Sequence, residues 1–193
     1  MLTPTTTDSS IQPSVSHETA ILGQGGLAVP GLPSLSMAWS KNGLVAVSFQ
    51  RFDASDAWAK AAQMKVPDEF ARPLMHYFAG EPVNPALLRV DLQGSDFQKR
   101  VWTALRHIPR GSVRSYAGIA ADIGSPRAVR AVGGANAANP VAVVVPCHRV
   151  VESGFRLGGY SGGLAIKRHL LRLEGIESRD NRVYPGQLEL AGG

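Results

Sequence analysis

The chain has 193 residues, 44% of them hydrophobic, and a formal net charge of +5, a size that suits one domain or two small ones with a substantial core. Its one cysteine excludes an internal disulfide and a cysteine-rich zinc site, and it suits a reducing compartment. The first ten residues contain neither a basic nor an apolar segment, and no apolar run in the chain is long enough for a membrane helix, so we expect a soluble cytoplasmic protein.

The charge divides unevenly along the chain. Residues 1–94 contain 6 Lys and Arg against 8 Asp and Glu, whereas residues 95–193 contain 14 against 7. The basic half suits a polyanionic partner, although an ordinary solvated basic face would give the same count. We expect an N-terminal α/β domain over 1–94, beginning with a flexible tail at 1–17, and a C-terminal domain over 95–193, ending in a polar tail extension at 176–193.

The sequence after the N-terminal tail predicts a small antiparallel sheet. Residues 34–40 and 44–49 are short alternating apolar runs, a pattern typical of strands with one buried face. The Asn42-Gly43 dipeptide between them favours a tight hairpin turn, because both residues tolerate positive φ.

Helices are predicted to follow this sheet, over residues 54–64 and 67–79. The second opens with a proline and two acidic residues and ends before Gly80, which are ordinary helix start and stop signals. Its apolar residues, Tyr77 among them, recur at helical spacing, which favours core packing over a binding role. Residues 87–92 are expected to return to the sheet as a strand.

The basic half predicts a helix-turn-helix. A helix over residues 95–107 is followed by one over 116–122 with Ser115 as its cap, and then by one that Ser125 caps and Pro126 begins. Two helices joined by a short turn that contains glycine have the spacing of a helix-turn-helix.

The last of these helices has two different faces. Val129 and Val132 fall on one side at 100° per residue. The opposite face consists of Arg127, Arg130, Ala131 and Gly134. Such small side chains permit close approach to DNA but offer little bidentate base reading, so we expect weak sequence specificity. Packing of this face against a neighbouring helix is the alternative.

The only cysteine follows an apolar run. Residues 141–145 are predicted to form a short buried strand that Pro146 ends, and Cys147 is then followed by His148 and Arg149. A neighbouring base or positive charge can convert a thiol to a nucleophilic thiolate, so this arrangement suits a reactive sulfur. A buried, inert cysteine beside a surface histidine is the alternative.

The segment Pro146-Cys147-His148-Arg149-Val150 resembles the active-site signature of the O6-alkylguanine-DNA alkyltransferases. Further matches stand in the order and approximate spacing of that family: Ser115-Tyr116, Ala131-Val132-Gly133-Gly134-Ala135, Asn139-Pro140, Tyr160-Ser161-Gly162-Gly163 and Leu170-Leu171-Arg172-Leu173-Glu174-Gly175. The resemblance covers about the last hundred residues up to Gly175 closely and the N-terminal half loosely. It implies an α/β (α+β) fold, with a ribonuclease H-like N-terminal domain and a winged-helix-like helix-turn-helix.

The resemblance also implies a function in direct-reversal DNA repair. Such a protein flips O6-alkylguanine out of duplex DNA, with O4-alkylthymine as a further candidate substrate, and transfers the alkyl group irreversibly to Cys147. This is the single-turnover activity of a methylated-DNA–protein-cysteine S-methyltransferase. We expect no cofactor, metal or methyl donor, because the chain lacks the zinc ligands of some relatives and a nucleotide-binding loop. The expected partner is the minor groove of double-stranded DNA, bound by a monomer that is nucleoid-associated if bacterial, with cooperativity left open.

The resemblance assigns roles to individual residues. Glu174 would orient His148, and His148 would deprotonate Cys147 through a water. Tyr116 would assist base rotation and return a proton to the departing guanine, while Arg130 would fill the gap left in the duplex. Without the resemblance, Glu174 could instead make surface ion pairs with nearby basic residues of its own helix, namely Arg168, His169 and Arg172.

Other residues would hold the substrate. Asn139 would brace the turn before the cysteine, the carbonyls of Cys147 and Val150 would accept hydrogen bonds from the guanine amino group, and Ser161 would contact the O6 edge. The remaining expected substrate or DNA contacts are Tyr160, Ser125 and Arg127.

Three other functions compete with repair. A damage sensor of related fold would lack the acceptor cysteine, so Cys147 argues against it. A regulatory helix-turn-helix protein would carry longer polar side chains on its recognition face. An unrelated Cys-His hydrolase would act on esters and would not require DNA.

Overall fold

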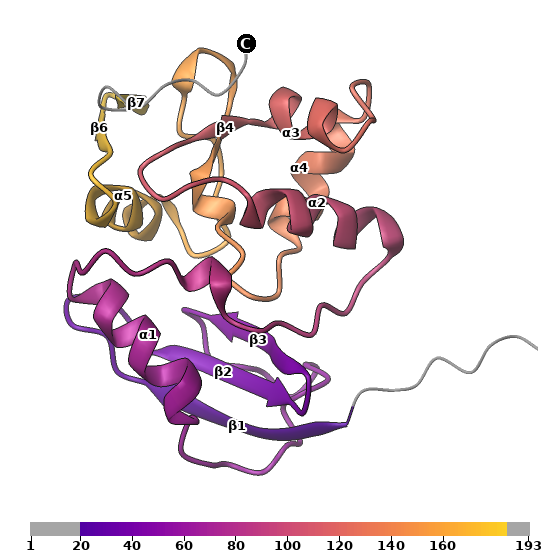
Figure 1. The fold of residues 1–193 in the computed structure, drawn as a ribbon, viewed down its shortest axis with the longest axis vertical. Coiled ribbons are helices and arrows are strands. Elements are labelled where there is room, and N and C mark those ends of the chain that lie inside the picture. Colours follow the sequence, from indigo (N-terminus) through magenta and orange to yellow (C-terminus); the bar gives the residue numbers. More distant parts are fainter. Residues whose placement is uncertain (1–19, 185–193) are drawn as a thin grey trace, which may run out of the picture.

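The computed structural model describes residues 20–184, and the predicted tail at 1–17 lies outside them. Figure 1 shows the two halves of the chain stacked along the longest axis, with a small sheet and one helix in the N-terminal half and most of the helices in the C-terminal half. The predicted mixed α/β fold is confirmed, while its ribonuclease H-like and winged-helix-like character stays a prediction. Within residues 20–184, no helix combines the length and the apolar character needed to cross a membrane.

The N-terminal sheet is antiparallel, in the order β1-β2-β3. Its strands are β1 (Ile21–Leu27), β2 (Leu35–Ser40) and β3 (Gly43–Ser48). The predicted hairpin between β2 and β3 is confirmed, and Gly43 has a φ of +147°. A Cβ at this position would lie 2.6 Å from the backbone of Arg89, so the turn needs glycine to let the later segment pass close by.

The predicted helix over residues 54–64 is wrong. The segment forms a series of turns instead. The side-chain amide of Gln24 in β1 donates to the carbonyls of Ala59 and Ala61, at 2.8 and 3.0 Å, and the Met64 amide donates to the Gln24 carbonyl at 2.8 Å. These bonds to the edge strand satisfy groups that a helix would have paired internally.

Helix α1 (Asp68–Phe78) is confirmed close to its predicted bounds, and Gly80, with a φ of +84°, follows its end. The strand predicted over 87–92 is wrong. A short 3-10 helix (Pro85–Leu87) replaces its start, and only a single bridge joins Val90 to Leu44 of β3.

Three helices form the predicted helix-turn-helix region. Helix α2 (Asp96–Arg106) begins at a capping box made by Ser95, and α3 (Tyr116–Asp122) is capped by Ser115, as predicted. Helix α4 (Val129–Ala137) begins three residues later than expected. Ser125 does not cap it: Ala128 is the residue before the helix, and no side chain caps this end.

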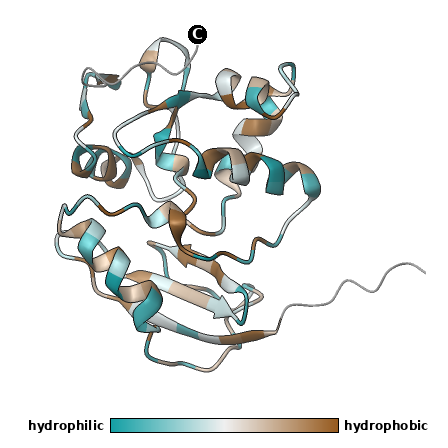
Figure 2. Ribbon diagram, viewed as in Figure 1, coloured by the Kyte–Doolittle hydropathy of each residue, from teal (hydrophilic) through white to brown (hydrophobic). Residues whose placement is uncertain are grey.

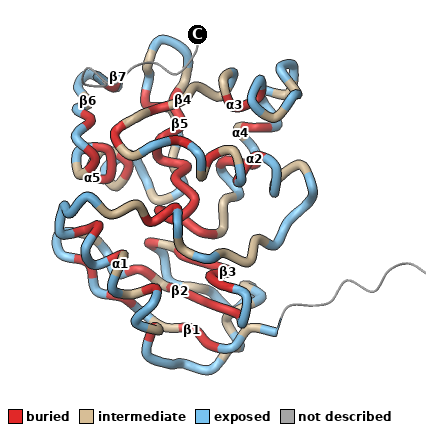
Figure 3. The backbone as a smooth tube through the Cα atoms, in the orientation of Figure 1, coloured by how far each residue is buried: buried red, intermediate tan, exposed pale blue. Residues whose placement is uncertain are grey.

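The strand predicted over residues 141–145 is also wrong, although all five residues are buried. The segment folds back on itself as a tight loop, in which Val143 has a φ of +70°. The loop is pinned to the N-terminal sheet: the Val47 amide of β3 donates to the Pro140 carbonyl at 2.8 Å, and the Ala142 amide donates to the Val47 carbonyl at 2.9 Å. In Figure 3, buried backbone runs through this junction between the two halves.

The loop leads into a 3-10 helix (Cys147–Arg149) and then β5 (Val150–Val151), which pairs in parallel with β4 (Arg114–Ser115). Another 3-10 helix (Ser153–Phe155) and α5 (Leu164–Leu173) follow. The described part of the expected tail extension is ordered rather than a tail: β6 (Glu177–Arg179) and β7 (Arg182–Tyr184) form a hairpin.

One hydrophobic core joins the two halves. It contains Trp39 of the sheet, Tyr77 of α1, Trp102 of α2, Cys147 and Leu170 of α5. In Figure 2, apolar colouring is strong along β3, whereas α1 and α2 each show both apolar and hydrophilic colouring. The halves are therefore held by shared apolar burial, and the cysteine lies within it.

Candidate active site

The sulfur of Cys147 lies in the interior, at the start of the 3-10 helix, and the residue is 1% exposed. The side-chain amide nitrogen of Asn139 lies 3.0 Å from Sγ and 2.8 Å from the Val145 carbonyl. The Asn139 carbonyl oxygen in turn accepts from the Val141 amide at 3.0 Å. One side chain thus ties both ends of the tight loop to the sulfur.

Burial raises the pKa of the Cys147 thiol, and the Asn139 hydrogen bond and the Lys167 charge offset this only in part. Desolvation disfavours the charged form, so the resting sulfur is a thiol that needs a base.

His148 follows Cys147 in the 3-10 helix. It is buried, and its Nε2 lies 3.0 Å from Glu174 Oε1. Burial lowers the pKa of His148 despite the carboxylate nearby, which keeps the imidazole neutral. Because Nε2 faces an ionised carboxylate, Nε2 carries the hydrogen and Nδ1 is left as an acceptor. Nδ1 is buried and has no hydrogen-bond partner among the described residues.

Glu174 is held by four hydrogen bonds. Besides His148, Arg149 donates to Oε2 through Nε at 2.9 Å and to Oε1 through Nη2 at 2.8 Å, and the Tyr77 hydroxyl donates to Oε1 at 2.7 Å. Although burial alone would raise it, the pKa of Glu174 is held well below its usual value by His148 and Arg149. The alternative of surface ion pairs is wrong, because Glu174 is buried and these are its partners.

Sequence reasoning did not place Arg149 or Tyr77 in the site. Arg149 was visible as a cation beside the cysteine, and a buried arginine requires a carboxylate partner. Tyr77 was assigned to the core, which is correct, but a buried tyrosine hydroxyl also requires a partner. The need of each buried polar group for a partner was the sequence signal that could have placed both residues in the site.

Lys167 is a further residue that sequence reasoning missed. Its ammonium group is buried and donates to the carbonyls of Val150 at 2.7 Å, Gly159 at 3.3 Å and Leu157. Burial lowers the pKa of Lys167 to about 8. The Val150 carbonyl, expected to accept from guanine, thus already accepts a hydrogen bond from Lys167.

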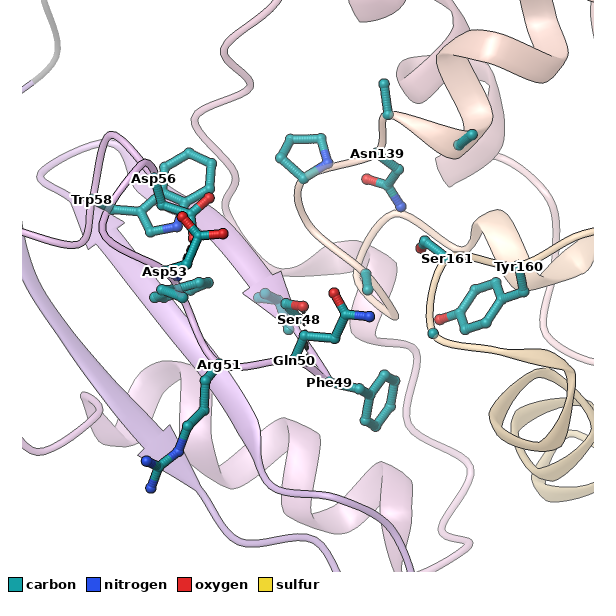
Figure 4. A pocket seen from close by; sticks show the side chains of 17 residues that line it. Ser48, Phe49, Gln50, Arg51, Asp53, Asp56, Trp58, Asn139, Tyr160 and Ser161 are labelled. Carbon is teal, nitrogen blue, oxygen red and sulfur yellow. Dashed lines mark hydrogen bonds between the residues drawn. The ribbon is translucent and has the colours of Figure 1, made fainter.

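A cavity of about 330 Å³ opens beside this site. Asn139, Tyr160 and Ser161 line one side of it, and the segment from Ser48 to Trp58 lines the other (Figure 4). The Tyr160 hydroxyl and the Trp58 indole nitrogen are buried without hydrogen-bond partners among residues 20–184. Because Asn139 borders both the cavity and the sulfur, the cavity lies one side chain away from Cys147.

Tyr116 is the first residue of α3 and is partly buried. Burial, and then the negative charge that Cys147 would carry, raise the pKa of Tyr116. A Cβ on Gly133 of α4 would lie 4.0 Å from its ring. Tyr116 therefore lies close to α4, and close enough to Cys147 for a charge on the sulfur to act on it.

Helix α4 presents an outer face of small and basic residues. Arg127, Arg130, Ala131 and Gly134 are exposed, and Val132 is buried as predicted. Val129 is 36% exposed, so the prediction that it faces inward with Val132 is wrong. Ser125 is half-buried in the turn before this helix. These residues form a surface separate from the buried group around Cys147.

The chain is similar to known proteins of one family. A family model described as the DNA-binding domain of 6-O-methylguanine DNA methyltransferase matches residues 96–176. The methylated-DNA–protein-cysteine methyltransferase of Methanosarcina acetivorans is 43% identical over 143 residues, covering 72% of this chain and 90% of that one. The protein of the same name from Mycolicibacterium paratuberculosis is 56% identical over 98 residues, or 51% of this chain and 59% of that one.

Solved structures show the same relationship. A crystal structure of Mycobacterium tuberculosis OGT in complex with DNA superimposes with a TM-score of 0.72 at 39% identity, covering 80% of this chain and 93% of that one. The O6-methylguanine-DNA methyltransferase of Pyrococcus kodakaraensis gives a TM-score of 0.60 at 26% identity, over 79% of this chain and 98% of that one. The chain belongs to the methylated-DNA–protein-cysteine methyltransferase family.

Proposed function

We propose that the protein repairs O6-alkylguanine in double-stranded DNA by moving the alkyl group irreversibly onto Cys147. The observation that carries this proposal is the buried Cys147 followed by a neutral His148, whose Nε2 is held by Glu174 and whose Nδ1 has no hydrogen-bond partner among residues 20–184. A thiol that needs a base thus lies next to a base with one unused acceptor.

The reaction balances with the residues at the site. The Cys147 proton passes to His148 Nδ1 through a water, and the sulfur attacks the alkyl carbon as the bond from that carbon to O6 breaks. Tyr116 returns a proton to the departing guanine and regains one from His148. A thioether and an unmodified guanine result, so no cofactor or methyl donor is consumed. Because a thioether has no easy route back to a thiol, each molecule reacts once.

The substrate base must leave the helix to reach a sulfur that is 1% exposed. The exposed small and basic face of α4 suits close approach to the minor groove, with Arg130 inserting where the base leaves. Tyr160 and Ser161, which line the cavity beside Asn139, would contact the extruded base. We place the protein with DNA in the cytoplasm, acting as a monomer.

We also keep the domain boundary near Gly94 as a proposal. A Cβ on Gly94 would lie 2.7 Å from the Trp102 ring, and the Ser95 cap of α2 follows at once. The chain therefore turns tightly from the N-terminal half into the helical half at this point.

The deciding experiment is intact-protein mass spectrometry after incubation with duplex DNA that contains O6-methylguanine, without S-adenosylmethionine. We expect the gain of one methyl group, mapped to Cys147, in proportion to the base restored. Cys147→Ser should bind the same duplex and gain nothing. Restoration of the base with an unchanged protein mass, or repeated turnover, would overturn the proposal.

A further inference from the structure

Tyr77 lies in the N-terminal half of the chain but contacts the relay in the C-terminal half. It comes from α1, is fully buried, and donates from its hydroxyl to Glu174 Oε1 at 2.7 Å. The two residues are 97 positions apart in sequence. Among residues 20–184, the hydrogen-bond partners of the Glu174 side chain are Tyr77, His148 and Arg149.

The hydroxyl shares one carboxylate oxygen with the imidazole. Oε1 of Glu174 accepts from Tyr77, from His148 Nε2 at 3.0 Å and from Arg149 Nη2 at 2.8 Å. Each additional donor stabilises the negative charge on that oxygen, so less of that charge is left to attract the other donors. The tyrosine hydroxyl therefore limits how strongly Glu174 stabilises a protonated His148.

The hydroxyl is also fixed in place. Burial, and then the Glu174 charge, raise the pKa of Tyr77 well above its ordinary value, so the group stays a donor. Its ring packs edge-on against Phe78, with centroids 5.2 Å apart, and Phe78 packs against Phe49 of the sheet side at 6.4 Å. The position of the carboxylate is thus set in part by the N-terminal half.

We propose that Tyr77 is a positioning residue for alkyl transfer: its hydroxyl fixes Glu174 and thereby keeps His148 in the neutral, proton-accepting form. The inference rests on the proposed function, because it concerns the same relay. It assigns part of that relay to α1, outside the region that the family model matches.

Other charged groups also surround His148. Lys167 lies within α5 and Glu174 at its C-terminal end. Arg149 and Cys147 flank His148 in the 3-10 helix. The charge of Arg110 acts on Tyr77. Replacing Tyr77 by phenylalanine changes none of these groups. A changed titration of His148 in that variant can therefore be assigned to the lost hydroxyl.

The test is the pH dependence of single-turnover transfer from an O6-methylguanine duplex. In Tyr77→Phe we expect the acidic limb to move up by about one pH unit, because Glu174 then holds a protonated His148 more strongly. The plateau rate should fall roughly threefold to tenfold, because the relay is less well oriented. NMR titration of labelled His148 should show the same upward shift without any substrate, and this readout does not depend on repair activity.

Two controls separate the hydroxyl from packing. Phe78→Leu disturbs the same turn of α1 but keeps the Tyr77 hydroxyl. It should lower stability and leave the acidic limb of the pH profile unchanged. Tyr184→Phe removes a hydroxyl from a residue that is 52% exposed. It should change neither the stability nor the acidic limb of the pH profile. If Tyr77→Phe leaves the limb unmoved, or if Phe78→Leu moves it equally, the inference is wrong.

A second substitution predicts the opposite sign. Incorporating 3,5-difluorotyrosine at position 77 keeps the ring and makes the hydroxyl a stronger donor, so the acidic limb should move to lower pH. This variant covers the case in which Tyr77→Phe does not fold. An upward shift or no shift would contradict the inference, whereas absence of transfer in the unmodified protein would instead contradict the proposed function.

Discussion

The side-chain amide of Asn139 donates to Cys147 Sγ at 3.0 Å and to the Val145 carbonyl at 2.8 Å. The residue that precedes the tight loop therefore touches the residue that follows it. This contact fixes the sulfur and partly offsets the effect of burial on the thiol pKa.

Asn139→Ala should impair both stability and transfer. The variant leaves the Val141 amide and the Val145 carbonyl without their side-chain partner, which should lower the free energy of unfolding by about 2 kcal/mol. It also removes the donor that favours the thiolate, so the transfer rate should fall roughly tenfold or more. Urea denaturation and single-turnover assays measure the two effects. Unchanged kinetics in a folded variant would contradict the role of this contact.

Glu174→Gln should show a stability defect that depends on pH. The carboxyl has a pKa held well below its unfolded value, so its stabilisation is fully present above about pH 4.3 and is lost as the pH falls through the folded pKa. At pH 7 the variant should be less stable by about 3 kcal/mol, since Arg149 stays buried without its charge partner. Denaturation from pH 7 to pH 3 should show the difference from the parent protein shrinking. A constant difference would contradict the prediction.

Lys167 should change stability in the same pH direction as Glu174, but in a higher pH range. Its folded pKa of about 8 lies below that of an unfolded lysine, so the unfolded state binds more protons between these values and stability gained from this group rises with pH. Relative to Lys167→Met, the parent protein should gain up to about 3 kcal/mol between pH 8 and about pH 10.4. Denaturation of both proteins across that range measures the gain. A falling difference would refute it.

Arg130→Ala should impair repair in duplexes more than reaction with a free base. We expect transfer from duplex DNA to fall roughly tenfold and reaction with free O6-benzylguanine to stay within about twofold, because only the duplex has a gap to fill. Arg127→Ala is the matched control: it removes the same charge from the exposed turn before α4 and should weaken binding only. Equal losses on both substrates would argue against insertion.

Gly134→Ala should separate fold stability from DNA binding. A Cβ at this position meets nothing within 4 Å, so alanine should stabilise α4 by about 1 kcal/mol. The same methyl group would stand on the face offered to DNA, where a misfit of about 1 kcal/mol lowers affinity roughly fivefold. Thermal unfolding and duplex titration test the pair of effects. An unchanged affinity would place the DNA elsewhere.

The sequence identifies the residues proposed to react better than it identifies the residues that hold them in place. Cys147 and His148 are neighbours in the chain, and Glu174 lies in a matched motif, so local patterns bring them to attention. Their assigned roles stay predictions. Tyr77 could not be paired with Glu174 from sequence, because the contact spans 97 positions and depends on how α1 docks on the helical half.

Two of the failed secondary-structure predictions share a cause. Residues 54–64 have helical composition, but Gln24 of the edge strand β1 bonds to their backbone groups. Residues 141–145 are as apolar as a buried strand, but Asn139 and Val47 close them into a loop. In each case a hydrogen-bond partner outside the predicted segment overrides the local preference of that segment for a helix or a strand.

Val143, with its φ of +70°, gives the loop a further property. A branched side chain in this region of φ costs about 1–3 kcal/mol. The loop is therefore strained, and its conformation depends on the hydrogen bonds to Val47 of β3. Warming that first breaks the hydrogen bonds at the edge of the sheet would let the loop relax. The sulfur would then move away from its position in the site. The protein should therefore lose its chemistry at a lower temperature than it loses its helices.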